Sequence, residues 1–114
     1  MTALLLSPGC AKQYGGLSTE MTITSRVPVG YVYALPYSDW NVNGGEDLLK
    51  PENHDKLKRL ASRAQAQVPA SLRLHRGYQY MFIFKHTTAD GEDEYRAVGP
   101  RTVAGEADTY DYSG

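Results

Sequence analysis

The sequence predicts an α+β domain, in which an antiparallel sheet of about four to five strands carries one amphipathic helix packed on a face. Two observations predict this class. The segment from Leu72 to Val98 has the pattern of an apolar β-hairpin, and the residues from Pro51 to Gln67 repeat their apolar side chains at helical spacing. With 114 residues, of which 41% are hydrophobic, the chain has the length and composition of one domain around a single core.

Three segments are expected along the chain. Residues 1–20 contain three glycines and one proline without apolar periodicity, so we expect a flexible N-terminal arm. A single α+β domain follows over residues 21–103. Residues 104–114 are acidic and carry Tyr110 and Tyr112, so we expect a C-terminal tail. This tail either docks its two rings on another surface or stays disordered.

The first strand region is expected between Thr22 and Leu35. Its apolar side chains alternate along the chain, which places Tyr31 and Tyr33 on the same face. Pro28 lacks the N–H group that a strand ladder uses, so this region should lie at a sheet edge or at a bulge.

A loop and then the helix are expected next. The loop covers Pro36 to Gly45 and carries Trp40, whose ring either closes the core from its rim or contacts a ligand. The helix is expected from about Pro51 to Gln67, because Val68-Pro69 would end it. Its apolar stripe consists of Leu57, Leu60, Ala61, Ala64 and Val68.

Charge is distributed unevenly. Residues 50–76 hold seven Lys and Arg side chains against two acidic ones, whereas residues 87–114 hold two basic side chains against seven acidic ones. The basic side chains on and after the helix form a candidate patch for phosphates or for an acidic protein, and a solvated helix surface is the alternative. The patch consists of Lys56, Lys58, Arg59, Arg63 and Arg73.

The expected hairpin turns at Asp90-Gly91, a dipeptide that suits the positive φ angles of short hairpin turns. Its first strand is apolar on both faces, since Met81 and Ile83 alternate with aromatic side chains. The aromatic face consists of Tyr78, Tyr80, Phe82 and Phe84. The helix can cover one face, so the other needs a second sheet, the N-terminal arm or a partner.

The sequence therefore favours a non-enzymatic interaction or assembly module, such as a small accessory or structural subunit of a virion or an inhibitor of a larger complex. The expected partner is another protein or a second copy of the chain in a homo-oligomer. The candidate interaction surface consists of Tyr78, Tyr80, Arg76, Tyr31, Tyr33, Trp40, Tyr110 and Tyr112.

Binding of single-stranded RNA is the alternative. The segment from Arg76 to Met81 resembles the central strand motif of the RNA-recognition-motif family, and the segment from Tyr31 to Ser38 resembles the family's first-strand motif. The resemblance implies that Tyr31, Tyr78 and Tyr80 stack on bases and that Arg76 contacts a phosphate. The family's second helix has no counterpart here, since a turn and a strand are expected after Thr87, so a protein partner is favoured.

Other kinds of chemistry find little support. Cys10 is the only cysteine, which excludes an intrachain disulfide and a thiolate zinc site. The three histidines, His54, His75 and His86, lack the spacings of metal motifs, so we expect no metal, no cofactor and no catalytic constellation. No stretch has the roughly 20 apolar residues of a membrane span. We expect a soluble protein of the cytoplasm or of a larger intracellular or virion complex.

Overall fold

The computed structural model describes residues 18–65, 67–103 and 108–114. These residues form seven strands, two short α-helices and two 3-10 helices. In chain order they are β1 (Ser18–Ser25), β2 (Tyr31–Pro36), α2 (Tyr37–Val42), η1 (Gly45–Leu49), η2 (Pro51–Asn53), α3 (His54–Leu60), β3 (Arg63–Gln65), β4 (Ala70–His75), β5 (Gln79–Thr87), β6 (Asp93–Thr102) and β7 (Asp108–Tyr112).

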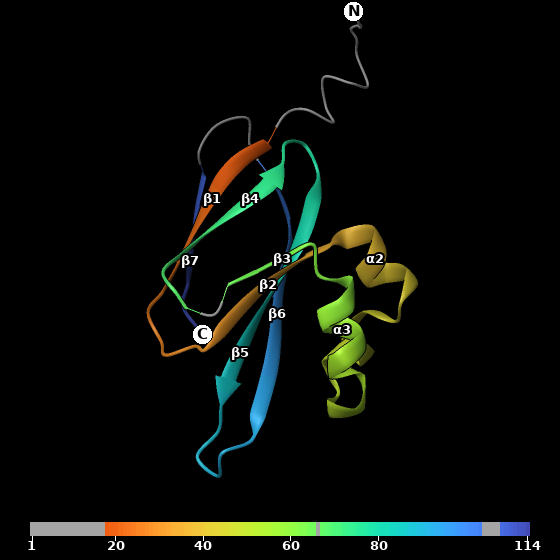
Figure 1. The fold of residues 1–114 in the computed structure, drawn as a ribbon, viewed down its shortest axis with the longest axis vertical. Coiled ribbons are helices and arrows are strands. Elements are labelled where there is room, and N and C mark those ends of the chain that lie inside the picture. The colour runs from red at the N-terminus through yellow and green to blue at the C-terminus, as the bar shows by residue number, and fades with distance from the viewer. Residues whose placement is uncertain (1–17, 66, 104–107) are drawn as a thin grey trace, which may run out of the picture.

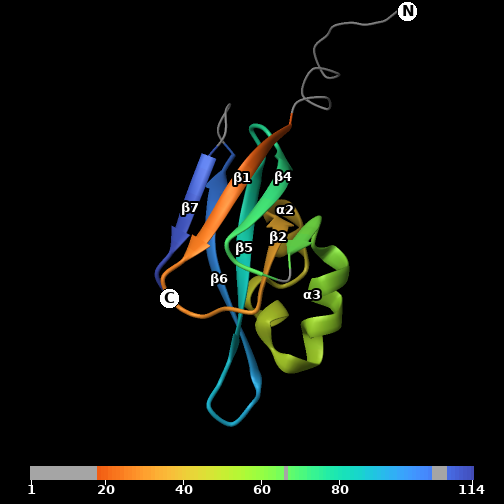
Figure 2. The ribbon, with the colours of Figure 1, turned by 60° about the vertical axis from the view of Figure 1, so that its left-hand side comes forward.

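The strands form two sheets that face each other. The larger sheet has the order β3-β2-β5-β6 and is antiparallel throughout. The smaller sheet has the order β4-β1-β7, in which β1 and β7 run parallel. Figures 1 and 2 show the smaller sheet on one side of the larger sheet and the helices on the other. The α+β class predicted from the sequence is confirmed, with two sheets where one was expected.

Strand β5 lies at the centre because both of its faces are buried. Phe82 and Phe84 point into a core between the two sheets, where Met21 and Ile23 of β1 cover them. Met81 and Ile83 point into a second core between the larger sheet and the helices. The two-sided burial predicted from the alternation is confirmed, and the smaller sheet supplies the cover for the aromatic face.

The prediction for the first strand of the hairpin is wrong in one respect. The segment predicted as one strand forms two strands, β4 and β5, which belong to different sheets. The chain turns between His75 and Tyr78, where the Tyr78 N–H donates to the His75 carbonyl at 3.4 Å. Gly77 has a φ of 80°, a conformation that glycine adopts without a side-chain penalty. This turn sends β4 to the smaller sheet and β5 to the larger one. The expected turn at Asp90-Gly91 does join β5 to β6.

The expected helix is also shorter than its apolar stripe suggested. Helix α3 ends at Leu60, because Ala61 is extended and the Ser62 N–H donates to the Ala34 carbonyl of β2 at 2.9 Å. The chain then continues as β3, which pairs with β2 and leaves Ala64 exposed. Strand pairing thus replaces the last turns of the expected helix.

The expected loop from Pro36 to Gly45 contains helix α2. Trp40 on this helix is 7% exposed and packs in the core between the helices and the larger sheet. The ring therefore closes this core, which is one of the two roles that the sequence left open.

Both expected terminal segments overlap with strands. Residues 18–20 belong to β1, where Thr19 is buried, so β1 begins before the expected domain boundary at Met21. Residues 108–112 belong to β7, which pairs with β1 inside the expected tail. The remainder of the expected arm, with Cys10, and residues 104–107 lie outside the described residues.

Candidate functional site

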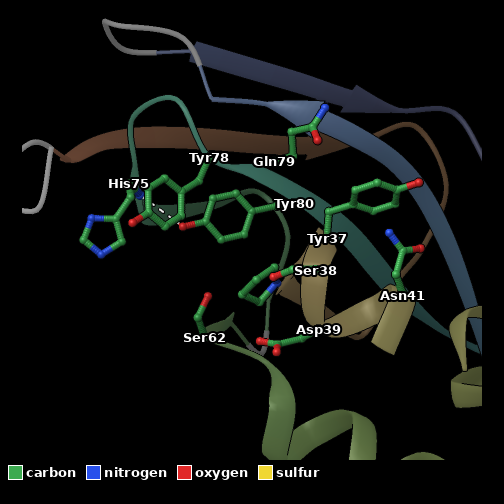
Figure 3. A pocket seen from close by; sticks show the side chains of 10 residues that line it. Tyr37, Ser38, Asp39, Asn41, Ser62, His75, Tyr78, Gln79 and Tyr80 are labelled. Atoms are coloured by element: carbon green, nitrogen blue, oxygen red, sulfur yellow. Dashed lines mark hydrogen bonds between the residues drawn. The ribbon is translucent and has the colours of Figure 1, made fainter. Parts of the chain in front are cut away.

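A groove of about 560 Å³ lies between the turn from His75 to Tyr78 and helix α2. Figure 3 shows it from close by, with His75, Tyr78 and Tyr80 on one side and Tyr37 and Asn41 on the other. Aromatic rings and short polar side chains share its surface, as is common for binding sites. The lining consists of Pro36, Tyr37, Ser38, Asp39, Asn41, Ser62, His75, Tyr78, Gln79 and Tyr80.

The turn between β4 and β5 places Tyr78 at the rim. Hydrogen bonds in both directions hold this turn against the end of β6, because Gly77 donates to the Val103 carbonyl and Val103 donates to the Tyr78 carbonyl, each at 3.0 Å. The Tyr78 ring lies against the ring of His75, with centroids 5.2 Å apart. Tyr78 is nevertheless 50% exposed, so about half of its surface remains available to a ligand.

The buried tyrosine Tyr80 lies at the inner end of the groove. It is 2% exposed, and its hydroxyl oxygen accepts a hydrogen bond from the backbone N–H of His75 at 3.2 Å. Burial raises the pKa of Tyr80 above its usual value, so the hydroxyl keeps its proton at neutral pH. Among the described residues this proton has no acceptor, and the hydroxyl can donate it to a bound group.

Helix α2 forms the opposite wall. Pro36 ends β2 opposite Tyr80 and leads directly into the helix, so the first turn of α2 must lie beside the groove. The last turn is fixed because the Asn43 side chain donates to the Asp39 carbonyl at 2.8 Å. Asp39 is the only acidic residue in the lining, and no basic side chain of the described residues lies within ion-pair distance of its carboxylate.

Of the eight residues predicted to form one interaction surface, the groove brings together Tyr78 and Tyr80. Tyr78 is accessible, while Tyr80 offers only its hydroxyl because its ring packs between the sheets. Arg76 lies in the adjacent turn, is half-buried, and has an Nε atom without a hydrogen-bond partner. It does not line the groove.

The other predicted aromatic residues lie elsewhere. Tyr33 and Trp40 are buried in the core between the larger sheet and the helices, and Tyr31 stacks on Tyr33 with ring centroids 5.4 Å apart. Neither face of β2 and β5 is open to a partner: helices cover one face, and the smaller sheet, one of the three covers that the sequence left open, covers the other.

The two tail tyrosines pack on the chain's own core. Tyr112 is 2% exposed and stacks on Phe84 with ring centroids 3.8 Å apart. Tyr110 is half-buried and lies beside Phe82, with centroids 6.1 Å apart. The tail does dock two rings, but the surface that receives them is the larger sheet of the same chain.

The predicted basic patch spans α3, β3 and β4, and all of its members are exposed. Arg73 pairs with Glu20 of β1 at 2.7 Å, which fixes its guanidinium on the outer face of the smaller sheet. No acidic side chain of the described residues lies within ion-pair distance of the other four members. These four are Lys56, Lys58, Arg59 and Arg63. Arg63 directly follows Ser62 of the groove lining, so part of the patch adjoins the groove.

The sequence prediction missed most of the groove. The sequence predicts a loop at Tyr37 and Asn41, although Tyr37 together with Trp40 gives that short segment two large aromatic residues. His75 was assigned to the interior of a strand, although Gly77 marks a turn two residues later. Ser62 could not be found, because its place depends on the early end of α3.

Comparisons of the chain with known protein families, with curated proteins and with solved structures gave no match. In the part of the chain that the structure describes, no group of three or more His, Cys, Asp and Glu side chains is placed to hold a metal ion. No helix within those residues is long and apolar enough to cross a membrane. The groove is therefore the feature from which a function can be argued.

Proposed function

We propose that this chain is a non-enzymatic protein-interaction module that binds a partner protein in the groove beside Tyr78. The observation that carries this proposal is the half-exposed ring of Tyr78, which stands at the rim of the groove instead of packing in either core. A large aromatic side chain left in water costs free energy that burial against a partner recovers.

The surroundings of Tyr78 fit a protein partner. Residues that contribute most to binding in protein interfaces are often tyrosines within a polar rim that excludes water. Ser38, Asn41 and Gln79 supply such a rim around the groove, and the Tyr80 hydroxyl supplies a buried donor. A bound main-chain carbonyl could accept from that hydroxyl while a side chain packs on the Tyr78 ring.

The nucleic-acid alternative has less support from the same geometry. Stacking of successive bases would need Tyr31, Tyr78 and Tyr80 on one exposed face. The ring of Tyr80 is buried between the sheets, and Tyr31 packs on Tyr33 on the helix-covered face of β2. Of these three residues, Tyr78 alone is exposed, so a protein partner is the function that we propose.

A displayed library of random peptides of about ten residues, roughly the length of a long strand, tests the proposal. Peptides selected on the wild-type chain should lose binding to Tyr78→Ala. Val42→Ala is the matched control, because Val42 is an exposed apolar side chain of α2, 83% accessible, that does not line the groove. Selected peptides that bind all three chains equally, or a selection without enrichment, would contradict a binding groove at Tyr78.

A second copy of the chain is the other protein that the groove could receive. Size-exclusion chromatography with light scattering on the wild-type chain and on Tyr78→Ala distinguishes the two kinds of partner. A concentration-dependent dimer that Tyr78→Ala abolishes would identify the partner as a second copy. A labelled single-stranded oligonucleotide, added at low salt, tests the nucleic-acid alternative in the same samples.

A further inference from the structure

The outer edge of β4 borders the groove. Strand β4 is the edge of the smaller sheet, where it pairs with β1 alone. At its end, the His75 N–H donates to the Tyr80 hydroxyl and the His75 carbonyl accepts from Tyr78, so both backbone groups of His75 point away from β1 and toward the groove. An edge of this kind can accept a further strand.

The alternation of a strand then fixes the direction of the other backbone groups. In an antiparallel pair, every second residue directs its N–H and C=O to the partner strand and the residues between direct them outward. Since His75 points outward, Arg73 must do so as well. The pairing of β1 agrees with this direction. Glu20 of β1 lies opposite Arg73, and its backbone groups point to the same side of β1 as those of Arg26, because the two residues have the same parity. The Arg26 N–H donates to the Tyr112 carbonyl of β7, so this side of β1 faces away from β4.

Arg73 therefore presents an open N–H and an open C=O at this edge, two residues before His75 of the groove lining. Neither group has a hydrogen-bond partner among the described residues. Strand β3 contacts β4 next to their short connection, and Figures 1 and 2 show the two strands separating farther from it. An added strand would run from the Arg73 edge past His75, so that one of its side chains reaches the groove.

The charged side chains near this edge favour one kind of partner segment. Arg63 adjoins the groove through Ser62 and Arg76 lies in the turn that follows β4, and neither has an acidic side chain of the described residues within ion-pair distance. Asp39 is the single acidic side chain in the groove lining. The excess of positive charge favours a segment with acidic side chains.

We propose that the partner docks by strand addition: an acidic, extended segment of another protein pairs with the open N–H and C=O of Arg73 and places an apolar or aromatic side chain against Tyr78. This inference rests on the proposed function and specifies its partner. Main-chain hydrogen bonds would supply affinity in this mode, and the groove would supply specificity.

The peptides selected from the displayed library test this mode. We expect them to alternate apolar and acidic residues. Their binding is then measured by fluorescence anisotropy on Arg73→Ala and Arg73→Pro. Both variants lose the guanidinium, but only Arg73→Pro also loses the N–H group, so binding should fall at least about tenfold further in Arg73→Pro than in Arg73→Ala.

A change in the peptide gives the same test without altering the protein, in case Arg73→Pro does not fold. N-methylation of every second peptide amide blocks one edge of the peptide. One methylated series should lose binding and the series shifted by one residue should keep it. Equal binding of both series, or equal binding to Arg73→Pro and Arg73→Ala, would overturn strand addition, and so would selected peptides without acidic residues.

The two proposals fail in different ways. If both methylated series bind equally but Tyr78→Ala abolishes binding, strand addition is wrong and the groove proposal stands. If Tyr78→Ala keeps full binding, the groove proposal is wrong and the strand-addition proposal that rests on it fails as well.

Discussion

The hydroxyl of Tyr80 accepts a hydrogen bond from the backbone N–H of His75 across 3.2 Å, although the two residues belong to different sheets. This bond connects the end of β4 with the beginning of β5 on the far side of the turn at Gly77. It holds the edge of the smaller sheet beside the groove and keeps Tyr78 at the rim. The buried hydroxyl therefore helps to position the candidate site, together with the backbone hydrogen bonds between the turn and Val103.

Replacing Tyr80 by Phe should destabilise the chain by about 1 kcal/mol. The ring would remain in the core, but the His75 N–H would lose its acceptor. Urea denaturation followed by circular dichroism measures the change. Tyr78→Phe is the control, because no described residue bonds to its hydroxyl and the ring is half-exposed, so its effect should stay within about 0.5 kcal/mol. Equal effects of both substitutions would show that the hydrogen bond is not needed.

Amide hydrogen exchange should alternate along β4. The amides of Leu72 and Leu74 point toward β1 and should exchange slowly, whereas the amide of Arg73 points outward and should exchange rapidly. Nuclear magnetic resonance on the free chain measures the exchange rate of each of these amides. Slow exchange at Arg73 would mean that the edge is already occupied, and strand addition would then have no open group to use.

Stability should fall as the pH drops below the ordinary pKa of histidine because of His86. Its Nε2 atom and the Tyr112 hydroxyl form a hydrogen bond of 2.7 Å, and burial together with the charge of Arg96 lowers the pKa of His86. The unfolded chain then binds a proton at a higher pH than the folded chain. The stability that the neutral His86 contributes is fully present above about pH 6.5, and it is lost as the pH falls through the lowered folded-state pKa of His86.

The comparison of wild type with His86→Gln isolates this contribution. The difference in unfolding free energy between the two chains should depend on pH between about 7.5 and 5 in the direction just given. A difference that stays constant over this interval would show that His86 titrates alike in the folded and unfolded chains.

A chain that ends at Val103 should lose cooperative unfolding. Its shortening removes β7 and with it the stacking of Tyr112 on Phe84 and the pairing with β1. The single substitution Tyr112→Ala should already cost about 3–5 kcal/mol, as expected for a buried aromatic side chain. Calorimetry measures both. Full stability of the shortened chain would mean that β7 is dispensable.

Local periodicity predicted the parts of the fold that depend on neighbours in sequence. The alternation around Phe82 and Ile83 gave the two buried faces of β5, and Asp90-Gly91 gave the hairpin turn. Both signals arise within a few residues, and the tertiary structure does not compete with them.

The errors arise where long-range pairing decides between local alternatives. The apolar stripe that includes Ala64 is compatible with a helix. The Ser62 N–H nevertheless donates to the Ala34 carbonyl of β2, and the chain continues as strand β3. Gly77 was treated as part of a strand, yet it turns the chain from one sheet to the other. The groove lies between these two places, so sequence periodicity predicted Tyr78 as an interaction residue but could not assemble the groove around it.

The most direct test of the central claim maps a selected peptide onto the amide signals of the isotope-labelled wild-type chain by nuclear magnetic resonance. The account predicts that the largest shifts occur at Arg73, His75 and Tyr78 and in the first turn of α2, and that Tyr78→Ala abolishes them. Shifts confined to the β5–β6 hairpin, or no shifts with the wild-type chain, would contradict it.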